Sequence, residues 1–244
     1  FYDDMRVPND ATPISYGLNS QLVKENGKIY ENVYKSGGLY GEAIDQIIFW
    51  LEKANAVAEN DAQRNYTNLL IDYYKTGDLN TWDEYNIAWV QDSVSMIDYV
   101  NGFIEDYGDP MGMKATWEAV VNFKDLEATK RTETLSKNAQ WFEDNSPVAP
   151  EFKKKEVKGM SAKVNKAAIL AGDLYPATAI GINPPNSDRA RAEHGSKSVT
   201  IGNLTDAYSQ AAKGNGMLQE FAYGPDEIAL IEAYGDATDD LHTD

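Results

Sequence analysis

With 244 residues, the chain is long enough for one large domain or two small ones with a sizeable core, and it contains no cysteine for disulfides or thiolate chemistry. Its 39 acidic and 22 basic residues give a net charge of −17, which disfavours nucleic-acid binding and attracts cations, including the amino terminus of a peptide. No apolar run approaches the ~20 residues that cross a bilayer, so we expect a soluble protein without a membrane partner, cytoplasmic as expressed.

An extended lead-in over residues 1–20 and a helical part over residues 38–145 are predicted for the first half of the chain. Apolar residues recur at helical spacing over residues 41–57 and again over residues 61–74. Gly77 supplies a stop for the second of these helices. Two antiparallel helices are the economical interpretation.

A capping box formed by Thr81 and Glu84 predicts that a further helix begins there. Residues 93–107 repeat apolar side chains at helical spacing and indicate another helical segment, which the Gly-Asp-Pro sequence at residues 108–110 breaks. The β-branched and aromatic run at residues 117–123 favours a strand.

A polar surface helix is predicted over residues 126–144, because apolar anchors are few. Residues 161–170 fit either a strand or a helix, since two polar residues interrupt the apolar pattern. Near the end of the chain, residues 205–212 indicate a short helix, and the proline and acidic residues at 224–227 open another.

Strand-like segments interrupt the helical pattern between residues 175 and 203. Residues 178–182 form an extended run that ends at Pro184-Pro185, and residues 198–201 indicate a second strand. A strand that ends in two prolines suits a sheet edge, where an extended peptide can add through main-chain hydrogen bonds. On pattern alone, a surface hairpin is the alternative.

The fold class predicted from these elements is α+β, mainly helical, with a small sheet near residues 117–123 and 160–203. The β-rich part at 160–203 would be the peptide-docking part, and residues 204–244 would form C-terminal helices. We treat residues 1–244 as a single domain-like unit.

Residue types for catalysis are scarce. The two histidines, His194 and His242, lack the spacing that places two imidazoles on one helix face, and no serine-nucleophile or phosphate-loop motif occurs. His242 and its acidic neighbours could chelate a cation weakly, but a charged chain end is usually only solvated. The residues alone do not assemble an enzyme.

Four motifs stand out in a fixed order: FIEDYGDPMG at 103–112, AIGINPPN at 179–186, HGSKSVTIGN at 194–203 and GDATDDLHTD at 235–244. In this order they resemble the dipeptidyl peptidase III family, whose members are zinc exopeptidases that release dipeptides from peptide N-termini. The resemblance covers nearly the whole chain and is closest to a bacterial, Bacteroidetes-type member.

In that family, the last motif leads into a His-Glu-x-x-Gly-His helix with two zinc ligands and the general base, and a later Glu-Glu-x-x-Ala-Glu segment supplies the third ligand. The sequence stops before that helix. Because catalytic zinc needs about three protein ligands and an open position, we expect a non-catalytic fragment without a cofactor. The missing zinc-bearing portion is the partner expected if the chain is only a scaffold that binds nothing alone.

The resemblance implies that this chain recognises the amino-terminal end of a peptide, so peptides with a free N-terminus are the expected partners. An ammonium has three donors and no acceptor, and carboxylates and amide carbonyls suit it. The matching positions are Glu105 for the ammonium, Tyr107 for the peptide backbone near the scissile bond, Asn183 and Asn186 for the amino terminus and adjacent backbone, and Gly181 and Ile182 for the strand edge.

Several positions depart from the family pattern. Pro184 stands where an aliphatic residue is expected, and Ser187, Arg189 and Ala190 stand where apolar or aromatic residues are expected. Asn165 and Lys166 interrupt the apolar pattern of a strand. We interpret these polar residues as engineered replacements on surfaces that once faced the deleted portion. Burial of these side chains in a native core would contradict that hypothesis.

Overall fold

The computed structural model describes residues 1–157, 162–176 and 178–212. The chain divides into two compact units, residues 1–202 and 203–244, and the first unit holds both sheets. The predicted α+β class is confirmed. In the described ranges, no helix has the length and apolar character that a membrane crossing requires.

Two helices follow the lead-in as predicted. α1 spans Gly41–Ala56 and α2 spans Asp61–Thr76. Gly77 ends α2 in the left-handed conformation with φ of 73°, and its N–H bonds to the Tyr73 carbonyl at 2.6 Å. One face of each helix is buried in the core, which includes Ile44, Ile48 and Leu51 from α1 and Tyr66, Leu70, Tyr73 and Tyr74 from α2.

The third helix, α3, spans Leu79–Gln91 and begins earlier than the capping box predicts. The Asp78 carboxylate accepts hydrogen bonds from the amides of Asn80 (3.2 Å) and Thr81 (3.3 Å). The prediction of a helix start at Thr81 is therefore wrong, because Asp78 already satisfies the free amides of the first turn.

We expect Asp78→Ala to lower the free energy of unfolding by about 1 kcal/mol, since it removes both bonds to the first-turn amides. Thr81→Ala is the matched comparison: it removes the hydroxyl that donates to Asp78 at 3.0 Å but leaves both amide bonds of the cap, so we expect it to cost less. Urea denaturation of both variants measures the difference. A larger loss for Thr81→Ala would restore the capping box as the true start.

The fourth element is a strand rather than a helix. β3 spans Ile97–Glu105 and occupies most of residues 93–107, so the helical prediction for that segment is wrong. Its side chains alternate between two faces, and both carry buried or half-buried residues. A strand covered on both sides has no clear alternation of apolar and polar residues, so its spacing resembles that of a helix.

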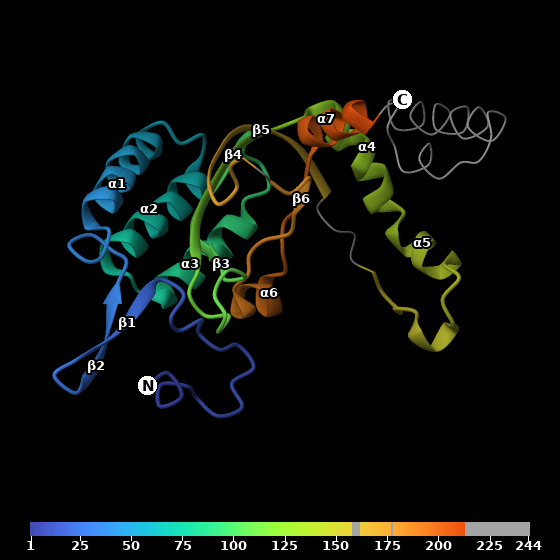
Figure 1. Ribbon diagram of the computed structural model, residues 1–244. Coiled ribbons are helices and arrows are strands. Elements are labelled where there is room, and N and C mark those ends of the chain that lie inside the picture. Colours follow the sequence, from blue (N-terminus) through green and yellow to red (C-terminus); the bar gives the residue numbers. More distant parts are fainter. Residues whose placement is uncertain (158–161, 177, 213–244) are drawn as a thin grey trace. The chain divides into compact units, whose positions relative to one another are not determined.

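The main sheet has five strands in the order β3-β4-β5-β7-β6 (Figure 1). β4 (Thr116–Lys124) confirms the predicted strand, and β5 (Ala162–Gly172) resolves the alternative of strand or helix. β7 (Ser198–Ile201) runs parallel to β5, and β6 (Gly181–Ile182) pairs antiparallel with β7. β6 therefore lies at an edge of the sheet, as the two prolines predict.

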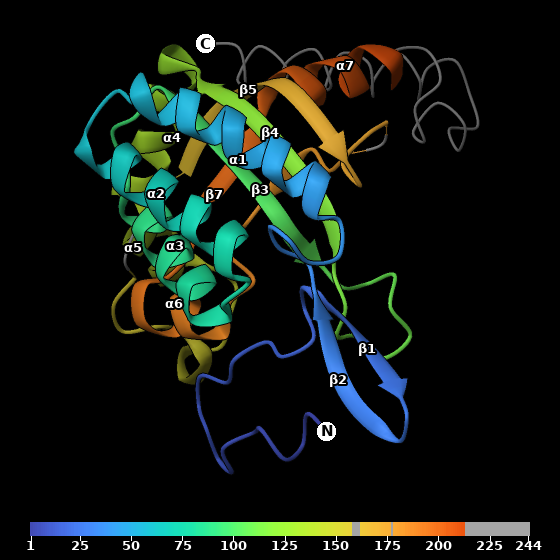
Figure 2. The same ribbon diagram turned by 90° about the vertical axis from the view of Figure 1, so that its left-hand side faces the viewer.

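Helices cover both faces of β3. Figure 2 shows α1 and α2 in front of β3 and β4. From α2, the Tyr74 hydroxyl donates to Asn101 at 2.7 Å, and from α3, the Trp89 indole N–H donates to Asp98 at 2.7 Å. Asn101 and Asp98 are three positions apart on one strand, so they point to opposite faces. The aromatic core is built on both sides of this strand.

The predicted surface helix at residues 126–144 is divided into α4 (Leu126–Lys137) and α5 (Ala139–Asn145), and a short 3₁₀ turn, η1, follows at Pro150–Phe152. None of the three contains a buried residue, which confirms the surface location. Several large apolar side chains are exposed along them, namely Leu126, Leu135, Trp141, Phe142 and Phe152.

Three smaller elements complete the described chain. β1 (Ser20–Glu25) and β2 (Lys28–Val33) form an antiparallel hairpin that the prediction lacks. α6 (Asp188–His194) is a second unpredicted element, whereas α7 (Gly202–Ala212) confirms the predicted short helix. Residues 1–19 contain neither helix nor strand, and the helix predicted at residues 224–227 lies outside the described residues.

The proposed polar replacements divide into two pairs. Asn165 is buried and donates to Asn122 across the sheet, and the buried Ser187 hydroxyl caps α6. Surface solubility does not explain these two residues. Lys166 and Arg189 form ion pairs at the surface, where the engineering hypothesis stays a prediction.

Candidate peptide-binding site

Glu105 ends β3 next to a β-bulge. Phe103 pairs with Trp117, but Glu105 pairs with the next residue of β4, Thr116, so β3 contains one extra residue. Such a bulge changes the direction of the following side chains. Because Thr116 and Glu118 share a face of β4, the bulge places Glu105 on the same face as Glu118.

Asn186 contacts Glu105 from a distant part of the chain. Its side-chain amide donates to the Glu105 carboxylate at 2.9 Å, although the two residues are 81 positions apart. Asn186 uses an N–H group in this bond, so its side-chain carbonyl oxygen remains an acceptor for a ligand. The structure therefore brings together two of the predicted site residues.

Asn183 lies in the loop between β6 and α6, which also contains Asn186. Donors outside this loop bind its backbone carbonyl groups. The Arg191 guanidinium of α6 donates to the carbonyl oxygens of Asn183 (3.0 Å) and Pro185 (3.2 Å). The amide of Lys197 donates to the carbonyl of Pro184 at 2.9 Å. These three bonds fix the loop backbone, and with it the approach of its side chains to Glu105.

Tyr107 stands next to Glu105 but is not packed into the fold. Its side chain is 82% exposed, and a hydrogen bond to Glu105, with a smaller effect of burial, raises the pKa of its hydroxyl to about 12. At neutral pH the hydroxyl is protonated and can donate. Glu105 thus has a donor on each side, Tyr107 and Asn186.

Gly181 and Ile182 form the whole of β6. They pair with Thr200 and Val199 of β7. Among the described residues no strand pairs with the other side of β6. An edge of this kind can accept an extended peptide, and it leads directly into Asn183.

Glu118 supplies a second carboxyl group on the Glu105 face. It is buried in the sheet, where its partners in register are Gly102 on β3 and Gly172 on β5. Burial, followed by the charges of Glu105 and Asp173, raises the pKa of Glu118 to about 7. The site therefore contains a second carboxyl group, and this one holds its proton up to a higher pH than an exposed glutamate does.

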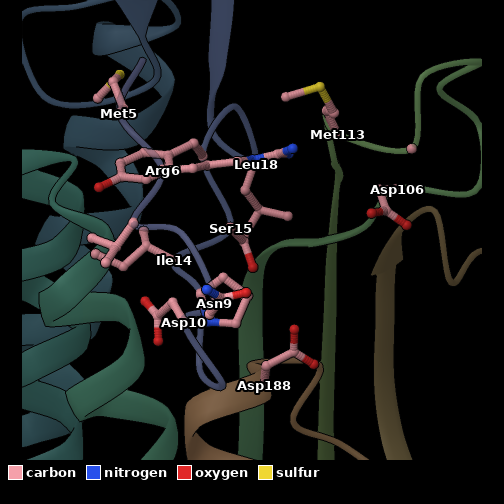
Figure 3. A pocket seen from close by; sticks show the side chains of 14 residues that line it. Met5, Arg6, Asn9, Asp10, Ile14, Ser15, Leu18, Asp106, Met113 and Asp188 are labelled. Carbon is pink, nitrogen blue, oxygen red and sulfur yellow. The ribbon is translucent and has the colours of Figure 1, made fainter. Parts of the chain in front are cut away.

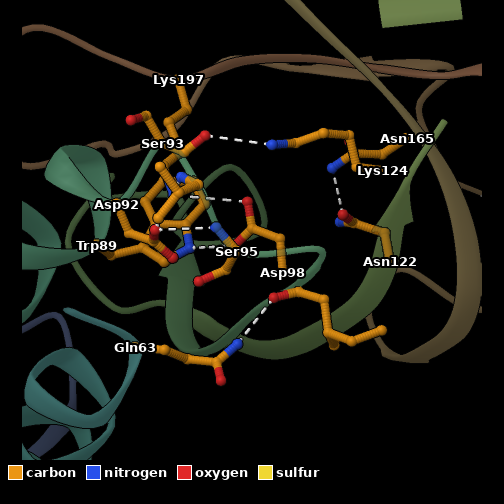
Figure 4. Close-up of polar contacts among 12 residues, drawn as sticks. Gln63, Trp89, Asp92, Ser93, Ser95, Asp98, Asn122, Lys124, Asn165 and Lys197 are labelled. Atoms are coloured by element: carbon orange, nitrogen blue, oxygen red, sulfur yellow. Dashed lines mark hydrogen bonds and ion pairs between the residues drawn. The ribbon is translucent and has the colours of Figure 1, made fainter. Parts of the chain in front are cut away.

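A buried ion pair lies near the loop that holds Asn183 and Asn186. The Lys197 ammonium is 3.5 Å from the Asp98 carboxylate and 4.1 Å from the centre of the Trp89 ring (Figure 4). Lys197 is also the residue whose amide binds the Pro184 carbonyl. The pair therefore ties the loop to α3 and β3.

A cavity of about 430 Å³ lies next to the segment after β3 and the start of α6 (Figure 3). Part of the lead-in, residues 5–18, forms one wall, and Asp106 and Asp188 point into the cavity from other sides. Asp106 follows Glu105 in the sequence, and Asp188 comes two residues after Asn186. The cavity combines carboxylates with apolar side chains and falls in the size range of ligand pockets.

Comparison with known proteins identifies the family of this fold. The family model for Peptidase family M49 matches residues 15–226. The chain belongs to peptidase family M49. Dipeptidyl peptidase 3 of Homo sapiens is 29% identical over 184 residues, which are 75% of this chain and 25% of that protein. Dipeptidyl peptidase 3 of Rattus norvegicus is 28% identical over 167 residues, 68% of this chain and 22% of that protein. The M49 chain described here spans about a quarter of the length of these relatives.

Two solved structures share the fold of this M49 chain. DPP III from Caldithrix abyssi has a TM-score of 0.72 and 23% identity, and the match covers 80% of this chain and 37% of that chain. Dipeptidyl-peptidase III from Corallococcus sp. strain EGB has a TM-score of 0.64 and 22% identity, and the match covers 80% of this chain and 36% of that chain.

Family M49 consists of zinc peptidases, but the described residues do not fit zinc. Within residues 1–157, 162–176 and 178–212, no three His, Cys, Asp or Glu side chains gather as a metal site. The His194 ring lies near Gln91 (3.5 Å) and Glu193 (3.8 Å), which provides no ligand set. His242 lies outside the described residues.

Sequence reasoning missed Glu118, Lys197 and Arg191. A signal for Glu118 was present, since an acid at a core-facing position of the strand at 117–123 is unusual and invites a functional explanation. Lys197 had no such signal, because a lysine between two serines is typical of a solvated loop. Arg191 lay in a helix that was not predicted.

Proposed function

We propose that this M49 chain binds the free amino terminus of peptides without cleaving them. The observation that carries the proposal is the hydrogen bond between Glu105 and Asn186 beside the unpaired edge β6. The sequence contains no His-Glu-x-x-Gly-His motif, so binding rather than hydrolysis is proposed for the chain by itself.

The chemistry of an ammonium group matches this pair. Its three N–H donors require acceptors, and the Glu105 carboxylate and the Asn186 carbonyl oxygen are two of them. A hydrogen bond to a charged group contributes on the order of 1.5 to 3 kcal/mol, and less where solvent reaches it. The net charge of −17 also favours the approach of a cation.

The strand edge supplies the second half of the proposal. A peptide that adds to β6 along Gly181 and Ile182 forms main-chain hydrogen bonds, and its amino terminus is then directed to Asn183 and Asn186. Tyr107 lies beyond Glu105 and can donate its hydroxyl to the peptide backbone. All six predicted site residues have a role in this arrangement.

The affinity of such a site is low. A two-residue peptide head has about 15 heavy atoms, and about 0.3 kcal/mol for each gives roughly 4.5 kcal/mol, or a Kd of roughly 0.5 mM. Calorimetry in the millimolar range is therefore the suitable measurement.

We expect tetra-alanine amide with a free amino terminus to bind at least about tenfold more tightly than its N-acetylated form, because acetylation removes the charge that Glu105 recognises. Glu105→Gln should reduce the affinity for the free amine to that of the acetylated peptide. Glu127→Gln, a charge change on the exposed surface of α4, is the matched control and should bind as the unaltered protein does. Equal affinity for the two peptides would rule out amine capture.

A second proposal is that the chain is a scaffold that completes a peptidase with a zinc-bearing portion. The observation that favours it is the row of exposed apolar side chains on α4, α5 and η1, including Trp141 and Phe152. The chain also spans only about a quarter of its relatives. The test is to mix the chain with the remaining portion of a dipeptidyl peptidase III and zinc; zinc-dependent release of dipeptides that neither part shows alone would support it.

A further inference from the structure

Glu118 lacks a partner in the described part of the chain. Its side chain is only 7% exposed, and no described donor or cation stabilises its carboxylate. The other buried acids of the same residues each accept a hydrogen bond: Asp98 from an indole, Asp92 from two amides and Asp83 from a hydroxyl. A buried carboxyl group that no donor or cation stabilises is costly to ionise.

The groups that face Glu118 from the described elements are all acidic or neutral. Glu105 comes from the end of β3, Asp173 from the turn after β5, and the Tyr107 hydroxyl from the loop after β3. Burial is the largest cause of the raised pKa of Glu118, and the negative charges of Glu105 and Asp173 raise it further, to about 7. Below that pH, the free protein holds a proton on this carboxyl group.

We propose that Glu118 is a second carboxyl group of the amine site and releases its proton to solvent when a peptide ammonium binds beside Glu105. The inference rests on the proposed function. In this exchange the ammonium keeps its three protons, the O–H bond of Glu118 breaks, and one proton enters the solvent. The charges balance, because the neutral acid becomes a carboxylate as the proton leaves.

The strand geometry supports this exchange. The β-bulge turns Glu105 to the face of Glu118, and Gly102 and Gly172 flank Glu118 on the neighbouring strands. The glycines themselves place no side chain beside Glu118, and the Trp82 and Trp117 rings that pack against Gly102 and Gly172 supply no acceptor or cation for it. The third donor of the ammonium, after Glu105 and Asn186, is available for Glu118.

The direction of the pH dependence follows from the raised pKa. Between pH 4.5 and about 7, the free protein binds a proton on Glu118 that the peptide complex does not. Affinity for a peptide ammonium therefore rises with pH through this window, by up to about tenfold per pH unit. Above about pH 8 the peptide amine itself loses its proton, and the affinity falls again.

Calorimetry with tetra-alanine amide tests the exchange. We expect its affinity to rise roughly tenfold between about pH 5.5 and about pH 7. At about pH 6, the binding enthalpy should differ between phosphate and imidazole buffers, since the buffer takes up close to one proton for each peptide bound. Measurable binding with the same enthalpy in both buffers would overturn the inference while leaving amine recognition intact.

Glu118→Gln is the decisive variant, because the amide copies the shape of the protonated acid and cannot release a proton. It should bind with one affinity at both pH values and one enthalpy in both buffers, whereas Glu127→Gln should keep the behaviour of the unaltered protein. A pH dependence that survives Glu118→Gln would assign the proton to another group. If no form binds the peptide at either pH, the proposed function fails and the coupling fails with it.

Urea unfolding without peptide gives a readout that does not depend on binding. The folded state holds the Glu118 proton between pH 4.5 and about 7, and the unfolded state does not. Relative to the Glu118→Gln variant, the unaltered protein should therefore lose stability as the pH rises through this range. Parallel pH profiles for the two proteins would show that Glu118 holds no such proton.

Discussion

Replacing Lys197 by Met is expected to lower the free energy of unfolding by about 3 to 5 kcal/mol, the range for removing one partner of a buried ion pair. Lys197 is only 2% exposed, and its ammonium lies 3.5 Å from Asp98. The methionine fills a similar volume but leaves the Asp98 charge buried with the Trp89 indole as a donor. The lost energy is that of an uncompensated charge rather than of lost packing.

The double variant Lys197→Met with Asp98→Asn separates these two contributions. If the penalty comes from the unpaired charge, neutralising Asp98 should recover a large part of it. Lys130→Met is the matched control, because Lys130 pairs with Glu127 on the exposed surface of α4, and it should change stability by less than about 0.5 kcal/mol. A cost for Lys197→Met as small as that of the control would mean that the pair does not hold the fold.

Breaking this pair also tests how the site is held. Lys197 binds the Pro184 carbonyl through its own amide, a bond that Lys197→Met retains. The side chain anchors the same residue to β3 and α3 through Asp98 and Trp89. At temperatures where the variant is folded, weaker amine binding would show that the anchor positions the loop that carries Asn186.

Local sequence patterns correctly predicted the elements that depend on interactions between residues close together in the chain. The stripes of α1 and α2 and the stop at Gly77 depend on neighbours within one or two turns, and the structure confirms them. The edge position of β6 followed from two prolines that cannot donate to a ladder. The Asn26-Gly27 pair, both with positive φ, was a hairpin signal of the same local kind that the prediction overlooked.

The errors arose where tertiary burial replaces local preference. β3 has helical apolar spacing because α2 and α3 bury its two faces, and no sequence window shows that covering. The start of α3 was misplaced for a different reason, since two residues competed as cap and only the geometry decides between Asp78 and Thr81.

The candidate site divides in the same way. The family motifs identified Glu105 and Asn186, and the structure brings these two side chains into contact. Motifs do not reveal which neighbouring groups are buried with them. The unpartnered carboxyl of Glu118 and the buried ammonium of Lys197 result from strand register and packing, which depend on residues far apart in the chain.

Replacing Gly172 by Ala is expected to lower the free energy of unfolding by roughly 2 to 4 kcal/mol, because it combines a left-handed backbone with a steric clash. Gly172 has φ of 63°, and an added Cβ would lie 2.1 Å from the carbonyl oxygen of Trp117. That oxygen also accepts the Asp173 amide at 3.1 Å. Relief of the clash must therefore move the backbone where β4 and β5 meet.

Gly27→Ala is the matched control for this substitution. Gly27 has φ of 80° but no atom within 4 Å of an added Cβ, so the variant should cost only about 1 kcal/mol, the backbone contribution alone. Urea denaturation of the two variants isolates the clash, and equal losses would show that β5 shifts freely at this end. Because Gly172 pairs with Glu118, a shift there should also change the pH dependence of amine binding, which connects the register of the sheet to the chemistry of the site.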